Sequence, residues 1–117
     1  MEVNKLREIV IDALEDVKAV DIAELNVRKM TSVTDLMVVA SGTSSRHVKS
    51  LADSVVMACK KAKMQPLGIE GEREGEWVLV DLGDIVVHVM QPTIREHYGL
   101  EKIWSVTEEK RELSQPL

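Results

Sequence analysis

The clearest hydrophobic pattern in the chain is a pair of apolar runs on either side of Gly83-Asp84, within residues 76–91. Gly followed by Asp suits a two-residue hairpin turn, because Gly supplies the positive φ of a type II′ turn. Such a turn places Leu82 opposite Ile85 and fixes the pairing of every residue behind them. The pattern therefore predicts a β-hairpin.

This register separates the hairpin into two surfaces, because side chains alternate between faces along a strand. One face is uniformly aliphatic and is expected to pack against helices as core. It carries Val78, Val80, Leu82, Ile85, Val87 and Val89. The other face is apolar with polar groups interspersed, and it carries Trp77, Leu79, Asp81, Val86, His88 and Met90. Either the chain's own final helix or a partner covers this second face, and both interpretations stay open.

Helices and strands alternate through the rest of the chain. A first helix capped by Asn4 is predicted by apolar residues at three- and four-residue steps, namely Leu6, Ile9, Val10, Ala13, Leu14 and Val17. A strand is expected over residues 20–27, and its alternation slips near Ala23-Glu24 as at a bulge. Apolar runs bounded by Pro and Gly predict a buried strand at 35–40, a brief strand at 66–71 and a short helix from Pro92 to Gly99.

A second helix begins after the hydroxyl-rich residues 41–47. Its buried face is expected to carry Val48, Leu51, Ala52, Val55, Cys59 and Ala62. A strand followed by Gly42, hydroxyls and a helix N-terminus with Arg46 is an arrangement that can hold an anion. The alternative is that Thr43 or Ser44 simply caps the helix, and we favour capping because no full phosphate-loop pattern is present.

The interleaved elements predict an α/β fold, a single domain with a mixed β-sheet packed with helices. The 117 residues fit one domain, which is expected to span 1–104, followed by a polar and flexible C-terminal tail at 105–117. The longest apolar runs are about five residues, far short of the ~20 that a membrane helix needs. No membrane partner is therefore expected, and the lone Cys59 fits the reducing cytoplasm.

Charge is unevenly distributed along the chain. The formal net charge of −5 argues against a surface that neutralises nucleic-acid phosphates. Six acidic residues and a single basic residue, Arg73, lie between Leu67 and Asp84. A partner that meets this region should be basic, because complementary charge speeds association and penalises wrong partners.

No constellation in the sequence indicates catalysis. Metal-dependent nucleotidyl transfer needs acids clustered on a strand, whereas the available acids flank turns: Glu70, Glu72, Asp81 and Asp84. His88 pairs with Leu79 and has no nucleophile beside it, and Cys59 falls on an apolar helix stripe, so both are interpreted as structural or interface residues. The histidines and the cysteine lack zinc-ligand spacing. We therefore expect no catalytic residue, no cofactor and no metal site.

Four longer motifs occur in order along the chain: DLMVVASGTSSRHVKSLAD, PLGIEGE, WVLVDLGDIVVHVM and LEKIW. Together they resemble the RsfS family of ribosomal silencing factors, also called Iojap, over about residues 3–105. The resemblance implies a nucleotidyltransferase-like fold without catalytic acids, and a non-enzymatic role. It further implies binding to the large ribosomal subunit through ribosomal protein L-fourteen, which blocks joining of the small subunit and represses translation under nutrient limitation.

The second hairpin face and the resemblance together predict one docking surface. Trp and Met suit an interface core, and acidic residues orient a basic ribosomal protein. The residues expected to contribute are Trp77, Asp81, Leu82, Asp84, His88, Met90 and Tyr98. Arg46 and Lys49 are expected near rRNA at the periphery. Two alternatives remain, a nucleotidyltransferase-like metal-dependent enzyme and a homodimeric adaptor module whose apolar face pairs with itself.

Overall fold

The computed structural model of the chain describes residues 1–102, so the predicted tail at 105–117 lies outside the described residues. The elements are α1 (Val3–Asp16), β1 (Val20–Asn26), β2 (Leu36–Ser41), α2 (Ser45–Lys61), β3 (Gly68–Glu70), β4 (Trp77–Asp81), β5 (Ile85–Met90) and α3 (Pro92–Tyr98). The interleaved order of helices and strands agrees with the sequence prediction.

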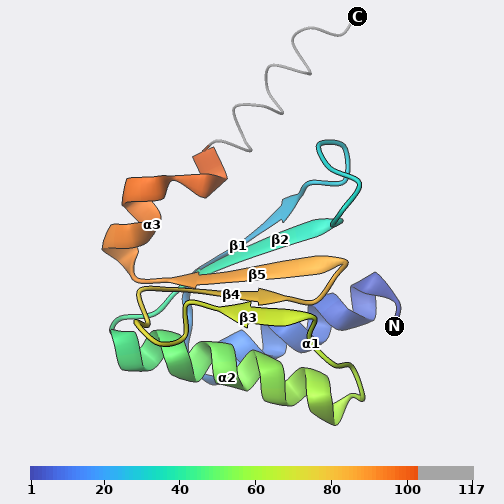
Figure 1. Ribbon diagram of the computed structural model, residues 1–117, viewed down its shortest axis with the longest axis horizontal. Coiled ribbons are helices and arrows are strands. Elements are labelled where there is room, and N and C mark those ends of the chain that lie inside the picture. Colours follow the sequence, from blue (N-terminus) through green and yellow to red (C-terminus); the bar gives the residue numbers. More distant parts are fainter. Residues whose placement is uncertain (103–117) are drawn as a thin grey trace, which may run out of the picture.

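The five strands form one mixed sheet in the order β1-β2-β5-β4-β3. The strands β2 and β5 pair in parallel, and every other pair is antiparallel. The helices α1 and α2 pack against each other on one face of the sheet, and α3 lies over one end of the opposite face (Figure 1). The α/β class and the mixed sheet are thus confirmed, with a two-layer arrangement over most of the sheet and a third layer only at α3.

The predicted hairpin is formed by β4 and β5 with the expected register. Trp77 pairs with Met90, Leu79 with His88, and the strands end at the pair Asp81 and Val86. The Leu82 amide donates to the Ile85 carbonyl at 2.9 Å, and Gly83 has a φ of +86°. A positive φ at the first central residue of the turn is the reason that Gly is required there.

The two faces of the sheet belong to two separate apolar clusters. All six residues of the aliphatic hairpin face are buried in the larger cluster, together with the buried faces of α1 and α2. The predicted stripe of α2 is confirmed at Val48, Leu51, Ala52, Val55 and Cys59, whereas Ala62 is only half-buried. The smaller cluster lies on the opposite face, under α3.

Two details near the N-terminus correct the sequence predictions. The cap of α1 is Glu2 rather than Asn4, because the Glu2 carboxylate accepts from the amides of Asn4 and Lys5. The bulge in β1 lies between Val20 and Ala23, before the predicted position. Asp21 has a φ of +49° at this point, which is the local conformation that breaks the alternation.

The hydroxyl-rich start of α2 is a capped helix terminus. The Ser44 Oγ accepts from the His47 amide at 3.0 Å, so capping by Ser44 is confirmed. His47 also ties this terminus to the end of α1, because its Nδ1 accepts from the Thr43 amide and its Nε2 therefore donates to the Val17 carbonyl at 2.7 Å. The Ser44 hydroxyl and both ring nitrogens of His47 are thus engaged in hydrogen bonds that stabilise the fold.

Candidate partner-binding surface

The helix α3 determines which part of the second hairpin face stays accessible. Pro92 is its first residue and Gly99 ends it in a left-handed conformation, as predicted. No residue of α3 is buried, yet Ile94 and the following Leu100 pack on the smaller cluster of Val27, Met37, Val39 and Met90. The sheet face is therefore covered near the end of β5 and remains partly open over β4.

Three of the predicted docking residues, Leu82, His88 and Met90, are buried in this structure, which leaves them little or no surface for direct contact with a partner. Met90 is 0% exposed beneath α3, and Leu82 is 3% exposed on the opposite, helix-covered face. The prediction of direct contact is wrong for Met90 and Leu82. Met90 instead supports the surface from below, since it lies in the cluster against which Trp77 packs.

Trp77, His88 and Tyr98 form a connected group that we call the aromatic cluster. The Trp77 indole N–H donates to His88 Nδ1 at 3.0 Å, and the Tyr98 ring centroid lies 4.9 Å from that of Trp77. Trp77 is half-buried and Tyr98 is 51% exposed. The hydrogen bond and the tilted ring contact hold the indole in one orientation at the edge of α3.

His88 positions Trp77 and contributes little surface of its own. Its side chain is buried on the second hairpin face beside Trp77, and this burial lowers the pKa of His88 to about 4. The ring is therefore neutral near pH 7, and its Nδ1 can accept the hydrogen bond from the indole N–H. The predicted contact role of His88 becomes an indirect one, through the orientation of Trp77.

The structure separates the predicted acidic residues of the hairpin from the aromatic cluster. Asp81 is the last residue of β4, four residues or roughly 13 Å along the strand from Trp77, and Asp84 lies in the turn beyond it. The Asp81 carboxylate accepts from the Gly83 amide, and the Asp84 carbonyl accepts from the Thr34 hydroxyl. The Asp81 side chain thus stabilises the turn, whereas the Asp84 backbone joins the turn to the residues before β2; Asp81 is half-buried and Asp84 is exposed.

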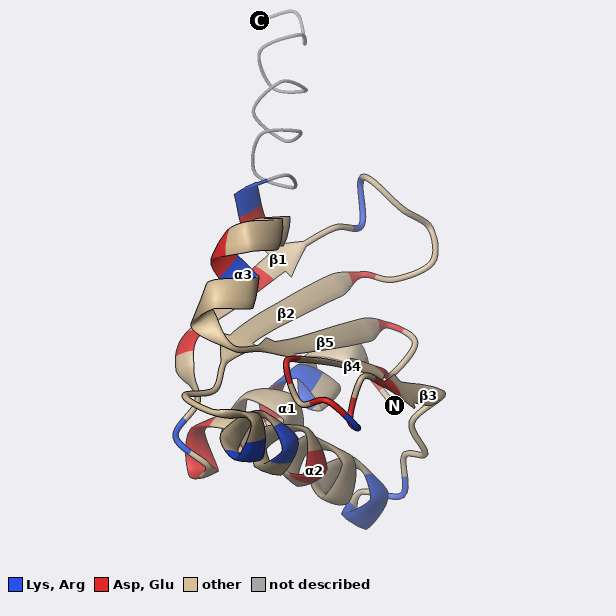
Figure 2. Cartoon of the chain, turned by 60° about the vertical axis from the view of Figure 1, so that its left-hand side comes forward, with Lys and Arg blue, Asp and Glu red and all other residues tan. Residues whose placement is uncertain are grey.

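Further acidic residues precede Trp77 in the chain, namely Glu70 at the end of β3 and the glutamates of the connection from β3 to β4. Glu70, Glu72, Glu74 and Glu76 are all exposed, and this connection leads directly into Trp77 (Figure 2). Sequence analysis found the excess of acids here but did not include them among the docking residues. The sequence already indicated them, because an acidic run directly precedes Trp77.

Arg46 and Lys49 lie in the first turns of α2, in the layer beneath the sheet. Arg46 is exposed, and Lys49 is half-buried beside the connection between β3 and β4. A Cβ placed on Gly75 would lie 2.9 Å from the Lys49 Cε, so this connection packs directly on the lysine stem. Lys49 thus borders the acidic connection.

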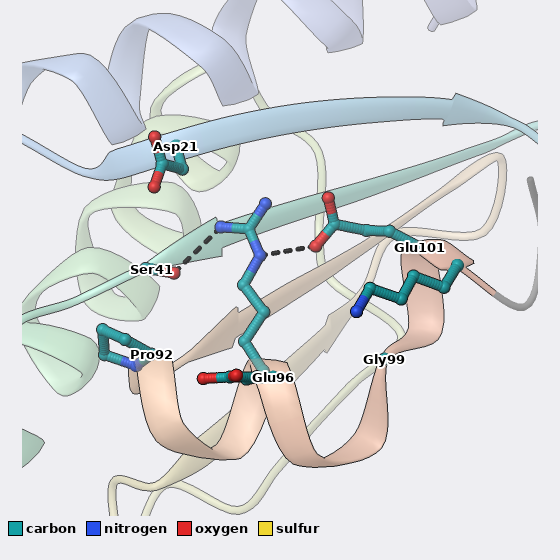
Figure 3. A pocket seen from close by; sticks show the side chains of 8 residues that line it. Asp21, Ser41, Pro92, Glu96, Gly99 and Glu101 are labelled. Carbon is teal, nitrogen blue, oxygen red and sulfur yellow. Dashed lines mark hydrogen bonds and ion pairs between the residues drawn. The ribbon is translucent and has the colours of Figure 1, made fainter.

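A cavity of about 250 Å³ lies on the other flank of α3 (Figure 3). Arg95 projects from α3 and donates to Ser41 on β2 at 2.9 Å and to Glu101 at 2.5 Å. Its side chain is only 13% exposed. The bond to Ser41 fastens α3 to the sheet, and the bond to Glu101 ties α3 to the residues that follow it. Local sequence patterns do not reveal the first role, because Arg95 and Ser41 are 54 residues apart.

In the part of the chain described, the residues considered for catalysis are buried or are not clustered with other catalytic groups. Cys59 is fully buried in α2, and burial raises the pKa of its thiol. Within residues 1–102, no group of three or more His, Cys, Asp or Glu side chains is arranged to hold a metal ion. In the same part of the chain, none of the helices has the length and apolar character to cross a membrane.

The fold and this surface define a small α/β domain with one buried sheet face and one partly open, aromatic and acid-bordered face. A model of the RsfS family, described as "Ribosomal silencing factor during starvation", matches residues 1–116. A ribosomal silencing factor RsfS from Chromobacterium violaceum is 49% identical over 89% of this chain and 85% of its own length. A ribosomal silencing factor RsfS from Haemophilus influenzae is 43% identical over 86% of this chain and 98% of its own length. The chain belongs to the RsfS family of ribosomal silencing factors.

More distant relatives and solved structures agree with this family. A mouse protein named "Mitochondrial assembly of ribosomal large subunit protein 1" is 34% identical over 92% of this chain, which spans 49% of that protein. A crystal structure of a Chromobacterium violaceum protein superposes with a TM-score of 0.88 at 48% identity, covering 90% of this chain and 88% of that one. A crystal structure of a Bacillus halodurans protein superposes with a TM-score of 0.79 at 31% identity, covering 86% of this chain and 94% of that one.

Proposed function

We propose that this protein is a translational repressor that binds the large ribosomal subunit through ribosomal protein L-fourteen. Bound there, it blocks joining of the small subunit and lowers translation under nutrient limitation. Membership of the RsfS family supports the proposal, since the family is described as silencing ribosomes during starvation. The name of the mouse relative also refers to the large ribosomal subunit.

The observation that supports this docking site is the partly exposed aromatic cluster, which lies next to an acidic connection. Trp77, which α3 leaves partly accessible, and Tyr98, the last residue of α3, offer aromatic surface next to each other. Interface centres favour such aromatic residues, whereas flanking charges orient the partner. The exposed glutamates before β4 suit a basic ribosomal protein. Asp81 and Asp84 form the remote part of this proposed surface.

The proposed repressor acts without catalysis, consistent with the family name, and works in the cytoplasm, where ribosomes are assembled and used. The exposed Arg46 and the neighbouring Lys49 contact rRNA at the edge of the protein interface. In the absence of ribosomes, the aromatic surface of one copy pairs with that of another. The kinship to the nucleotidyltransferase fold stays a prediction.

Co-sedimentation with purified subunits tests the proposal. The protein should sediment with large subunits, and adding small subunits should then yield fewer joined ribosomes than in its absence. Failure to sediment with large subunits would contradict the proposal. Turnover of nucleotides in the presence of magnesium would support the enzyme alternative instead, and a dimer that persists alongside bound large subunits would argue against competition for one surface.

A further inference from the structure

A groove of about 270 Å³ opens on the sheet face between the end of β3 and the start of β4. It is lined by Glu70, Gly71, Trp77 and Leu79. Glu70 and Leu79 are register partners across the two strands, so the carboxylate and the aliphatic side chain stand next to each other on one face. The groove thus combines an aromatic wall, an aliphatic floor and one acidic side chain.

Gly71 keeps one side of this groove open. Its φ is +84°, a conformation that residues with a side chain rarely adopt. A Cβ at this position would lie 2.0 Å from the Trp77 carbonyl oxygen, which is a severe overlap. The backbone therefore runs directly against Trp77, and no side chain can project from position 71 without moving the chain.

The Trp77 ring and the Glu70 carboxylate, which line the groove, are both groups that attract a cation. The Trp77 indole is held by its hydrogen bond to His88, so the ring is ordered without a partner. Glu70 is exposed, and within residues 1–102 no basic side chain is paired with it. A cation placed beside an aromatic ring is attracted by the ring quadrupole, and a carboxylate adds a charge-assisted hydrogen bond.

We propose that this groove receives an arginine side chain of the basic partner, with the guanidinium against the Trp77 ring and hydrogen-bonded to the Glu70 carboxylate. Arginine fits better than lysine, because its planar group stacks on an aromatic ring and still presents N–H donors at its edge. The aliphatic stem of the arginine lies over Leu79. The inference rests on the proposed docking to the ribosome and names the side chain that the docking surface selects.

The test compares Glu70→Gln with Glu72→Gln in binding titrations against purified large subunits. Both variants remove one negative charge from exposed positions two residues apart, but Glu72 does not line the groove. Glu70→Gln should weaken binding about tenfold and Glu72→Gln less than about twofold. The melting temperature of each variant should match that of the original chain, since neither carboxylate supports the fold.

A double-mutant cycle adds Trp77→Leu, which keeps an apolar wall and removes the π face. If ring and carboxylate hold one guanidinium, the fold-loss of the double variant will be smaller than the product of the two single losses. Equal effects of Glu70→Gln and Glu72→Gln, or independent effects of ring and carboxylate, would overturn the groove while leaving docking intact. An original chain that does not bind large subunits would overturn both the groove and the proposed docking.

Discussion

The two faces of the sheet are built from the same alternating strands but are covered in different ways. On one side α1 and α2, of 14 and 17 residues, bury all six aliphatic residues of the β4–β5 hairpin to at most 3% exposure. On the other side the seven-residue α3 covers one end and has no buried residue itself. Trp77 and Leu79 there remain half-exposed. An apolar strand position is therefore core or surface according to what packs above it.

This difference assigns separate tasks to the two faces. The aliphatic face holds most of the buried apolar area and hence most of the hydrophobic stabilisation. The aromatic face contributes less to folding, so it can retain accessible surface for a partner. Substitutions on the first face should act on stability, and substitutions on the second should act on binding.

The largest effect is expected from Leu51→Ala in α2. Leu51 is 0% exposed in the larger cluster, so its truncation leaves a cavity and should cost about 3 to 5 kcal/mol of unfolding free energy. Leu79→Ala is the matched control on the open face and should cost about 1 to 2 kcal/mol, because this side chain is only partly buried and its truncation leaves no enclosed cavity. Chemical denaturation measures both, and equal losses would break the distinction between the faces.

An acid titration sharpens the comparison through His88. Its pKa is lowered in the folded state to about 4 from 6.5, so folding favours the neutral ring. The stabilisation is fully present above pH 6.5 and is lost as the pH falls towards 4, with a size on the order of 2 to 3 kcal/mol. His88→Asn keeps an acceptor for Trp77 and every carboxylate of the chain. Unfolding free energies measured from pH 7 to pH 4 should fall more steeply for the original chain than for this variant.

Parallel pH profiles of the two proteins would contradict the role assigned to His88. Protonation places a donor on Nδ1, where the indole N–H already points, so acid should also disorder Trp77. The fluorescence of Trp77 reports this when Trp104 is replaced by Phe.

A smaller effect is expected from Arg95→Met, which keeps the apolar stem and removes the bonds to Ser41 and Glu101. The loss should be about 1 kcal/mol, confined to the attachment of α3. Hydrogen exchange should accelerate at the amides of α3 and remain unchanged in α2. Arg28→Met is the control, since the Arg28 side chain is 61% exposed and its pair with Asp35 spans 3.4 Å. If hydrogen exchange accelerated equally at the amides of α2 and α3, α3 would not open independently of the rest of the fold.

Local sequence patterns were sufficient to predict most of the fold. The period-two alternation and Gly83-Asp84 fixed the hairpin register, and the stripe on α2 followed from three- and four-residue spacing. The cap and the bulge were misplaced, because Glu2 is an uncommon cap and because Asp21 adopts a positive φ that alternation alone does not reveal.

The docking surface was predicted less well, for two different reasons. Leu82 already fell on the core face in the predicted register, so its inclusion disagreed with the pattern itself. Met90 is buried because α3 folds back over β5, and the direction taken after Gln91 depends on tertiary packing. The groove was not predicted, because it depends on the close approach of Gly71, just after β3, to the Trp77 carbonyl in β4. Local sequence patterns do not reveal such a tertiary contact.

The most direct test of the division between the two faces is to measure stability and large-subunit binding for Trp77→Ala in the same preparation. Binding should weaken by about 2 kcal/mol, whereas the melting temperature should change little, because Trp77 lies at the edge of the smaller cluster. A collapsed melting temperature with unaltered binding per folded molecule would contradict this account and would make Trp77 part of the core.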